Sequence, residues 1–80
     1  IRMKYLFVIN PISGGKDKSE VIKIIEKEFD SYQFFHTTKR FDPNQLTSEI
    51  KSFQPENVIA IGGDGTILYC TIAMLSLSKR

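Results

Sequence analysis

The sequence predicts an α/β fold in which three βα units form a parallel sheet with helices on both faces, giving three layers. A short apolar run, a turn and a helical pattern follow one another in that order three times along the 80 residues. The runs have the β-branched and aromatic composition of strands, and the segments between them carry apolar residues at helical spacing. Right-handed connections would place such strands parallel in one sheet.

The composition is that of a soluble globular domain. Apolar residues make up 41% of the chain and the net charge is only +2, so neither disorder nor a nucleic-acid partner is indicated. No apolar run reaches the roughly 18 residues that a membrane-spanning helix needs. The single cysteine, Cys70, cannot form an internal disulfide. It is consistent with a reducing compartment, so we expect a cytoplasmic protein.

The first unit begins with residues 4–9, which are almost uniformly apolar, as in a strand buried on both faces. Asn10-Pro11 ends this run, and Asp17 or Ser19 is expected to cap the next helix. The apolar face of that helix consists of Val21, Ile22, Ile24, Ile25 and Phe29. Its lysines fall on the other side, which predicts a helix with one face packed on the sheet.

The second unit begins with residues 32–38, which have strand composition throughout. Asp42 is a favourable N-cap and Pro43 suits the first position of a helix. Leu46, Ile50 and Phe53 then recur at helical spacing. Pro55 is expected to end this helix.

The third unit begins with the strand Asn57–Ile61, which leads directly into the glycine-rich residues 62–66. Residues 67–77 then form a helical segment that is apolar nearly all round. Such a helix favours burial on more than one side. We therefore expect a partner, a homodimer or a further part of the chain to cover it.

Ligands of parallel α/β sheets bind at the carboxyl ends of the strands. This rule brings together the three loops at residues 10–16, 38–41 and 62–66. Each of them carries polar or glycine residues suited to a ligand.

The sharpest motif is Gly62-Gly63-Asp64-Gly65-Thr66, which joins a strand to the start of a helix. Its glycines allow a tight turn and a close approach of the backbone to a ligand. Free N–H groups and the helix dipole at this point favour an anion such as phosphate. A carboxylate beside phosphate requires a cation or a substrate hydroxyl between them. Asp64 is therefore predicted either to organise magnesium or to act as the base for an attacking hydroxyl.

The loop after the first strand is the second motif and also suits phosphate, with a lysine as a point charge. Its residues are Asn10, Pro11, Ile12, Ser13, Gly14, Gly15 and Lys16. It is not a Walker A loop, since Asp17 stands where serine or threonine is required. The Gly63-x-Gly65 segment is not a dinucleotide fingerprint, because Leu68 replaces the third glycine.

Together, Asn10-Pro11-x-Ser13-Gly14-x-Lys16 after the first strand and residues 62–66 after the third resemble the catalytic domain of diacylglycerol kinases, sphingosine kinases and bacterial lipid kinases. NAD kinases share the second motif. The resemblance covers residues 1–80. It implies that they form the N-terminal, truncated part of an ATP-binding catalytic domain that normally continues through further α/β units and a β-rich second domain.

The resemblance also implies a nucleotide site that holds ATP with magnesium for phosphoryl transfer to a lipid hydroxyl such as that of diacylglycerol. The full-length protein would then contact a membrane peripherally. The residues that would bind the nucleotide are Asn10, Pro11, Ile12, Ser13, Gly14, Lys16, Thr38, Gly62, Gly63, Asp64, Gly65 and Thr66. Asp64 would be the catalytic residue and the magnesium ligand.

One departure from the family pattern leaves alternatives open. The family commonly has Asn-Glu two residues after the threonine of the second motif, whereas this chain has Leu68 and Tyr69. A non-catalytic nucleotide-binding module or degenerate kinase is therefore one alternative. An NAD-kinase-like enzyme is another, because leucine at position 68 resembles that family.

Overall fold

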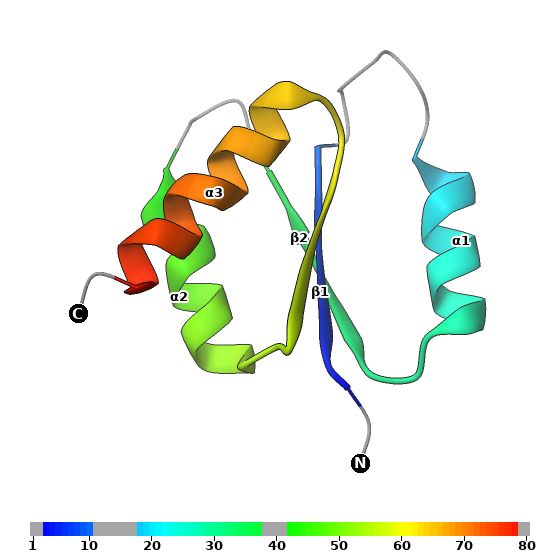
Figure 1. The fold of residues 1–80 in the computed structure, drawn as a ribbon. Coiled ribbons are helices and arrows are strands. Elements are labelled where there is room, and N and C mark those ends of the chain that lie inside the picture. The colour runs from blue at the N-terminus through cyan, green and yellow to red at the C-terminus, as the bar shows by residue number, and fades with distance from the viewer. Residues whose placement is uncertain (1–2, 11–17, 38–41, 79–80) are drawn as a thin grey trace.

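The computed structural model describes residues 3–10, 18–37 and 42–78 of the chain. Its elements alternate between strand and helix, as predicted (Figure 1). In chain order they are β1 (Tyr5–Ile9), α1 (Ser19–Glu28), β2 (Tyr32–His36), α2 (Pro43–Phe53), β3 (Asn57–Ile61) and α3 (Asp64–Ser78). The three strands form one sheet in the order β2-β1-β3, and both strand pairs are parallel.

The register of the sheet brings the three strands to an end at the same level. Tyr5 at the start of β1 pairs with Tyr32 of β2 and with Asn57 of β3. Ile9 at the end of β1 pairs with His36 and with Ile61. The loops that follow the strands therefore leave from a single edge.

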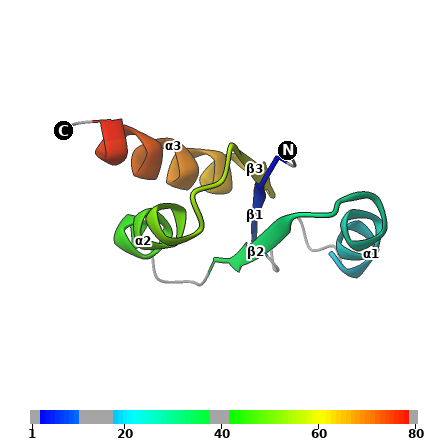
Figure 2. The ribbon, with the colours of Figure 1, turned by 90° about the horizontal axis from the view of Figure 1, so that it is seen from below.

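The helices cover both faces of the sheet. The chain moves one way across the sheet from β1 to β2 and the opposite way from β2 to β3. Right-handed connections consequently place α1 and α2 on opposite faces. Figure 2 shows α1 on one side of the sheet and α2 with α3 on the other. The predicted three-layer α/β class is thus confirmed.

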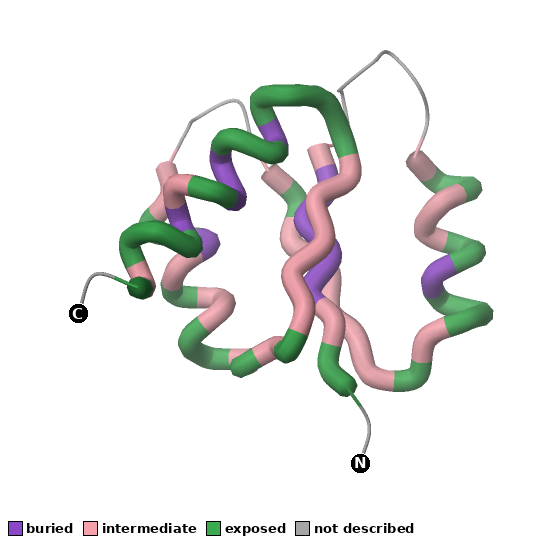
Figure 3. Tube along the Cα trace, viewed as in Figure 1, coloured by how far each residue is buried: buried purple, intermediate pink, exposed green. Residues whose placement is uncertain are grey.

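The core consists of two apolar clusters, one on each face, which share the central strand. Figure 3 shows the buried stretches on β1 and on the helices at either side. Leu6 and Val8 of β1 point to the α2–α3 side, where they pack with Leu46, Tyr69, Cys70 and Ala73. Phe7 and Ile9 point to the other side and pack with Ile25 of α1. Each of these β1 side chains is at most 3% exposed, which corresponds to about 1.5–3 kcal/mol of stabilisation apiece.

The helix ends test the capping predictions. Asp42 caps α2 as predicted: its Oδ1 accepts a hydrogen bond from the Asn44 N–H at 3.1 Å. Helix α2 ends at Phe53, and Gln54 has a left-handed backbone conformation before Pro55. Of the two residues predicted to cap α1, Asp17 lies outside the described ranges, and the prediction for Ser19 was wrong. Helix α1 begins at that residue, with Lys18 at the N-cap position and no capping side-chain hydrogen bond.

Helix α3 begins at Asp64, three residues before the predicted start at residue 67. The backbone N–H groups of Thr66 and Ile67 both donate to the Gly63 carbonyl, at 3.1 and 3.3 Å. Gly63 therefore occupies the N-cap position, and the last part of the glycine motif is the first turn of the helix. Because glycine has a low helix propensity, the sequence predicted a loop here and not the first turn of a helix.

Candidate functional site

The carboxyl ends of the three strands are joined by hydrogen bonds. The Ile9 carbonyl at the end of β1 accepts both the Thr37 N–H, at 2.9 Å, and the Thr37 hydroxyl, at 3.4 Å. On the other side, the Asn10 N–H donates to the Ile61 carbonyl of β3 at 3.2 Å. These bonds fix Asn10 and the start of the glycine motif beside one another at the edge where the sequence predicted a ligand site.

The strand order divides this edge at a switch point between β1 and β3. The chain leaves β1 toward α1 on one face of the sheet, and it leaves β3 toward α3 on the other face (Figure 2). Ligands of open α/β sheets usually bind in the crevice outside the strand ends at such a switch point. The residues of the first and second loops that were predicted to bind a ligand, Pro11, Ile12, Ser13, Gly14, Lys16 and Thr38, lie outside the described ranges.

Gly62 allows the turn at the end of β3 to close against its neighbours. A Cβ atom at this position would lie 2.5 Å from the Thr66 Oγ1 and 3.3 Å from the Asn10 Cβ. No side chain fits at such distances unless Thr66 moves. Glycine is required here by the packing of the protein itself.

Gly65 is surrounded by open space instead. A Cβ atom there would have no heavy atom within 4 Å. Gly65 and Asp64 are the first residues of α3 and both are exposed. Their N–H groups precede those that bond to Gly63, so they lie outside the helical hydrogen-bond ladder. The helix end thus presents donors and a positive dipole to an open space, as anion-binding helix ends do.

Thr66 contributes a buried hydroxyl beside this helix end. The residue is only 3% exposed, and within the described part of the chain its Oγ1 atom has no hydrogen-bond partner. Leaving such a group unsatisfied costs about 1–3 kcal/mol. Because Oγ1 faces Gly62 at the point where β1 and β3 end, a ligand oxygen in the crevice is a candidate for the missing partner.

Asp64 is exposed at the first position of α3, where a carboxylate interacts favourably with the helix dipole. Among residues 3–10, 18–37 and 42–78, no group of three His, Cys, Asp or Glu side chains could hold a metal ion. Magnesium is commonly bound through one or two carboxylates together with substrate phosphates and water. Asp64 fits that mode of binding, with phosphate oxygens supplying other ligands.

A sequence model of the diacylglycerol kinase catalytic domain matches residues 4–80. The chain belongs to the diacylglycerol kinase catalytic domain family. No curated protein and no solved structure matches the chain. Within the described residues, no helix is long and apolar enough to cross a bilayer.

The two positions that depart from the diacylglycerol kinase pattern have different surroundings. Leu68 is 57% exposed on the surface of α3. Tyr69 is 5% exposed, its ring stacks on Phe35 of β2, and its hydroxyl donates to the Asp42 carbonyl at 2.7 Å. Burial, aided by Asp42 and Cys70, raises the pKa of Tyr69. The sequence motif indicated only that an acid is missing at position 69. It did not predict the contact of Tyr69 with the start of α2.

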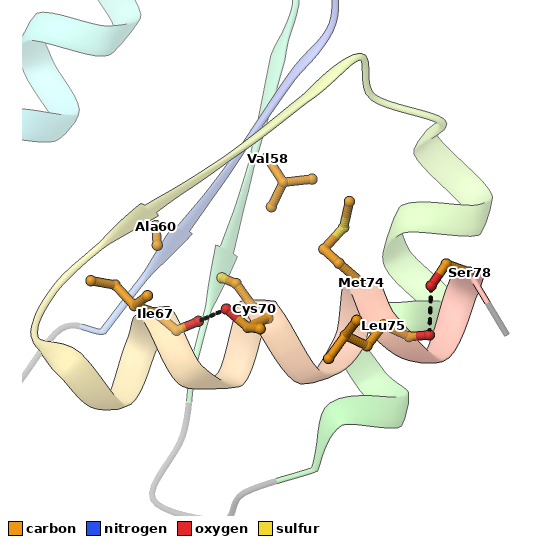
Figure 4. Close-up of a pocket in the computed structure, with 8 residues that line it drawn as sticks. Val58, Ala60, Ile67, Cys70, Met74, Leu75 and Ser78 are labelled. Carbon is orange, nitrogen blue, oxygen red and sulfur yellow. Dashed lines mark hydrogen bonds between the residues drawn. The ribbon is translucent and has the colours of Figure 1, made fainter.

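A hollow of about 470 Å³ lies between β3 and α3 (Figure 4). Apolar side chains line most of it: Val58, Ala60, Ile67, Cys70, Met74 and Leu75. Its two hydroxyl residues, Thr71 and Ser78, donate back to the carbonyls of Ile67 and Leu75 within α3. Apart from these two hydroxyl groups, which are already bonded within the helix, the hollow offers an apolar surface.

Proposed function

We propose that the chain binds ATP with magnesium in the crevice between the ends of β1 and β3, as the nucleotide-binding part of a lipid kinase. The observation that carries the proposal is the buried Thr66 hydroxyl, which has no partner among the described residues and lies beside the open N-terminus of α3. Family membership supports the same function, since the match is to a diacylglycerol kinase catalytic domain.

In this proposal, each group at the start of α3 has a distinct task. The N–H groups of Asp64 and Gly65 would donate to phosphate oxygens, and the Thr66 hydroxyl would supply a further donor. Asp64 would hold magnesium or accept the proton of the attacking hydroxyl. Magnesium would neutralise charge that develops on the phosphate oxygens during transfer. Phosphoryl transfer depends mainly on such positioning and charge stabilisation, which backbone donors can provide.

The acceptor in this proposal is a lipid hydroxyl such as that of diacylglycerol. A non-catalytic nucleotide-binding module is the second candidate, and one observation favours it. The family commonly has an acid at position 69, but here Tyr69 is buried and its hydroxyl donates a hydrogen bond to the Asp42 carbonyl. This side chain therefore does not supply the family's acid. The two candidates share the ATP site and differ only in whether transfer follows.

The binding step is tested by titrating the chain with magnesium and ATP while following backbone amide shifts. We expect saturable shifts at Asn10 and at residues 62–66, with little change at the opposite edge near Tyr5. Replacing Asp64→Asn should weaken the dependence of binding on magnesium. An absence of shifts at millimolar ATP would remove the proposed site.

The transfer step is tested with γ-labelled ATP and the intact natural protein, offering a diacylglycerol or NAD as acceptor. Label in the lipid supports the kinase, and label in NAD instead supports the NAD-kinase alternative. ATP binding without transfer to any acceptor supports the non-catalytic module. An Asp64→Asn variant is the matched control, because it should abolish transfer and leave the fold unchanged.

A further inference from the structure

We propose that Tyr69 is a positioning residue that holds the N-terminus of α3 in register with Asp42 at the start of α2 and with β2, so that one nucleotide can contact both the start of α3 and the neighbouring strand ends. The inference rests on the proposed ATP function. It concerns a residue that differs from the family's usual acid, and it gives that residue a task in ligand binding.

The Tyr69 hydroxyl bonds to a rigid part of the neighbouring element. Asp42, whose carbonyl accepts this bond at 2.7 Å, is the N-cap of α2. The same carbonyl accepts the Gln45 N–H at 3.2 Å, and the Asp42 carboxylate accepts the Asn44 N–H at 3.1 Å. Tyr69 therefore holds a backbone position that other hydrogen bonds already fix.

The proposed phosphate site lies at the start of the same helix that carries Tyr69. Tyr69 lies five residues after Asp64 in the same helix, or about 7.5 Å along its axis. Its ring is buried and stacks on Phe35 of β2, with the ring centroids 6.3 Å apart. A helix fixed at this point has little freedom to rotate or slide, so the direction of its first N–H groups is set relative to β2 and α2.

This geometry matters for a ligand that spans more than one strand end. In this proposal a triphosphate at the start of α3 would lie against that helix, the glycine turn and the end of β1. The nucleoside of ATP would extend over the neighbouring strand ends, where Thr37 is bonded to Ile9 at the end of β1. When the Tyr69 hydrogen bond already holds the start of α3 in place relative to these strand ends, ATP binding does not have to order them. Less of the binding free energy is then lost.

The test compares Tyr69→Phe with Tyr5→Phe in titrations with magnesium ATP and with magnesium tripolyphosphate. Tyr5 is a matched control, because its hydroxyl lies near Met3 at the far end of the sheet. We expect Tyr69→Phe to bind ATP about two- to tenfold more weakly, as for the loss of one net hydrogen bond. Tripolyphosphate affinity should stay within about twofold of wild type, and Tyr5→Phe should change neither affinity.

Equal weakening of both ligands would overturn the proposal, since the hydroxyl would then only support α3. Unchanged ATP affinity would overturn it as well. If the wild-type chain binds neither ligand, the proposed function fails, and amide hydrogen exchange decides the role of Tyr69 separately. Faster exchange at Asn44 and Gln45 in Tyr69→Phe, with β1 unaffected, supports the view that the Tyr69 hydrogen bond stabilises the start of α2. Unchanged exchange at those amides refutes it.

Discussion

Replacing Gly65→Ala distinguishes a glycine that the fold requires from one that a ligand requires. A Cβ atom at position 65 would meet no heavy atom within 4 Å, so the substitution has no steric cost in the free protein. Alanine also restricts the unfolded chain and favours the helix. We therefore expect the free energy of unfolding to rise by about 0.4–1 kcal/mol. For a domain of this size, the midpoint of thermal unfolding should rise by about 2–8 °C.

The same methyl group should impair ligand binding, because it would occupy part of the open space at the start of α3 where the phosphate is proposed to bind. Loss of one hydrogen bond to a charged phosphate corresponds to about 1.5–3 kcal/mol. The dissociation constant for magnesium ATP should therefore increase about tenfold or more. Circular dichroism measures the stability and calorimetric titration measures the affinity. A less stable Gly65→Ala protein, or one with unchanged ATP affinity, would refute the assignment of this space to a ligand.

Three further predictions follow from the surroundings of single residues. Gly62→Ala should lower the free energy of unfolding by about 1–3 kcal/mol through overpacking against Thr66, and a neutral result in urea titration would contradict the close approach. Tyr69→Glu should cost about 3 kcal/mol or more, because it buries a carboxylate against a carbonyl. Leu68→Asn should stay within about 0.5 kcal/mol, so equal losses in the two variants would argue against their different burial. Burial raises the pKa of the Cys70 thiol above its ordinary 9.0. Above that pH the unfolded chain releases the proton first, so stability should fall with rising pH. The fall should be smaller in Cys70→Ala, where the buried Tyr69 hydroxyl, whose pKa is also raised, still contributes. Alkylation of the native wild-type protein at pH 8 should be slow. Rapid alkylation of the native protein at pH 8 would contradict a buried thiol.

The fold could be predicted largely because β1 and α2 bury their apolar residues at regular spacing. Residues 4–9 are apolar at nearly every position, and β1 indeed buries alternate side chains in two different clusters. The single-sided stripe of α2 likewise leads to a helix that buries Leu46. Helix starts were harder to predict. Serine is a common N-cap residue, but Ser19 is already the first residue of α1. A capping residue indicates that a helix begins nearby without fixing the residue at which it begins.

The candidate site could be located from the sequence but not built from it. Parallel strands and the glycine motif were sufficient to predict the edge at which Asn10 and residues 62–66 meet. The different reasons for the two glycines could not be predicted, because Gly62 faces Thr66 across a turn and Gly65 faces open space. It was equally impossible to predict that the Thr66 hydroxyl has no partner within the described residues, since threonine in a first helical turn usually finds a partner or solvent.

The departure at Leu68 and Tyr69 shows why a motif position must be interpreted with its surroundings. In the sequence, both residues count equally as losses of a polar function. In the structure, Leu68 is on the surface and a polar side chain fits there at little cost. The side chain of Tyr69 is buried between α3, Phe35 of β2 and the Asp42 carbonyl. A carboxylate at this position would find no hydrogen-bond donor or positive charge among these contacts. A change back to the family's usual pair therefore combines one inexpensive step with one that requires α2 and α3 to repack. Any activity of this chain must arise with Tyr69 in place.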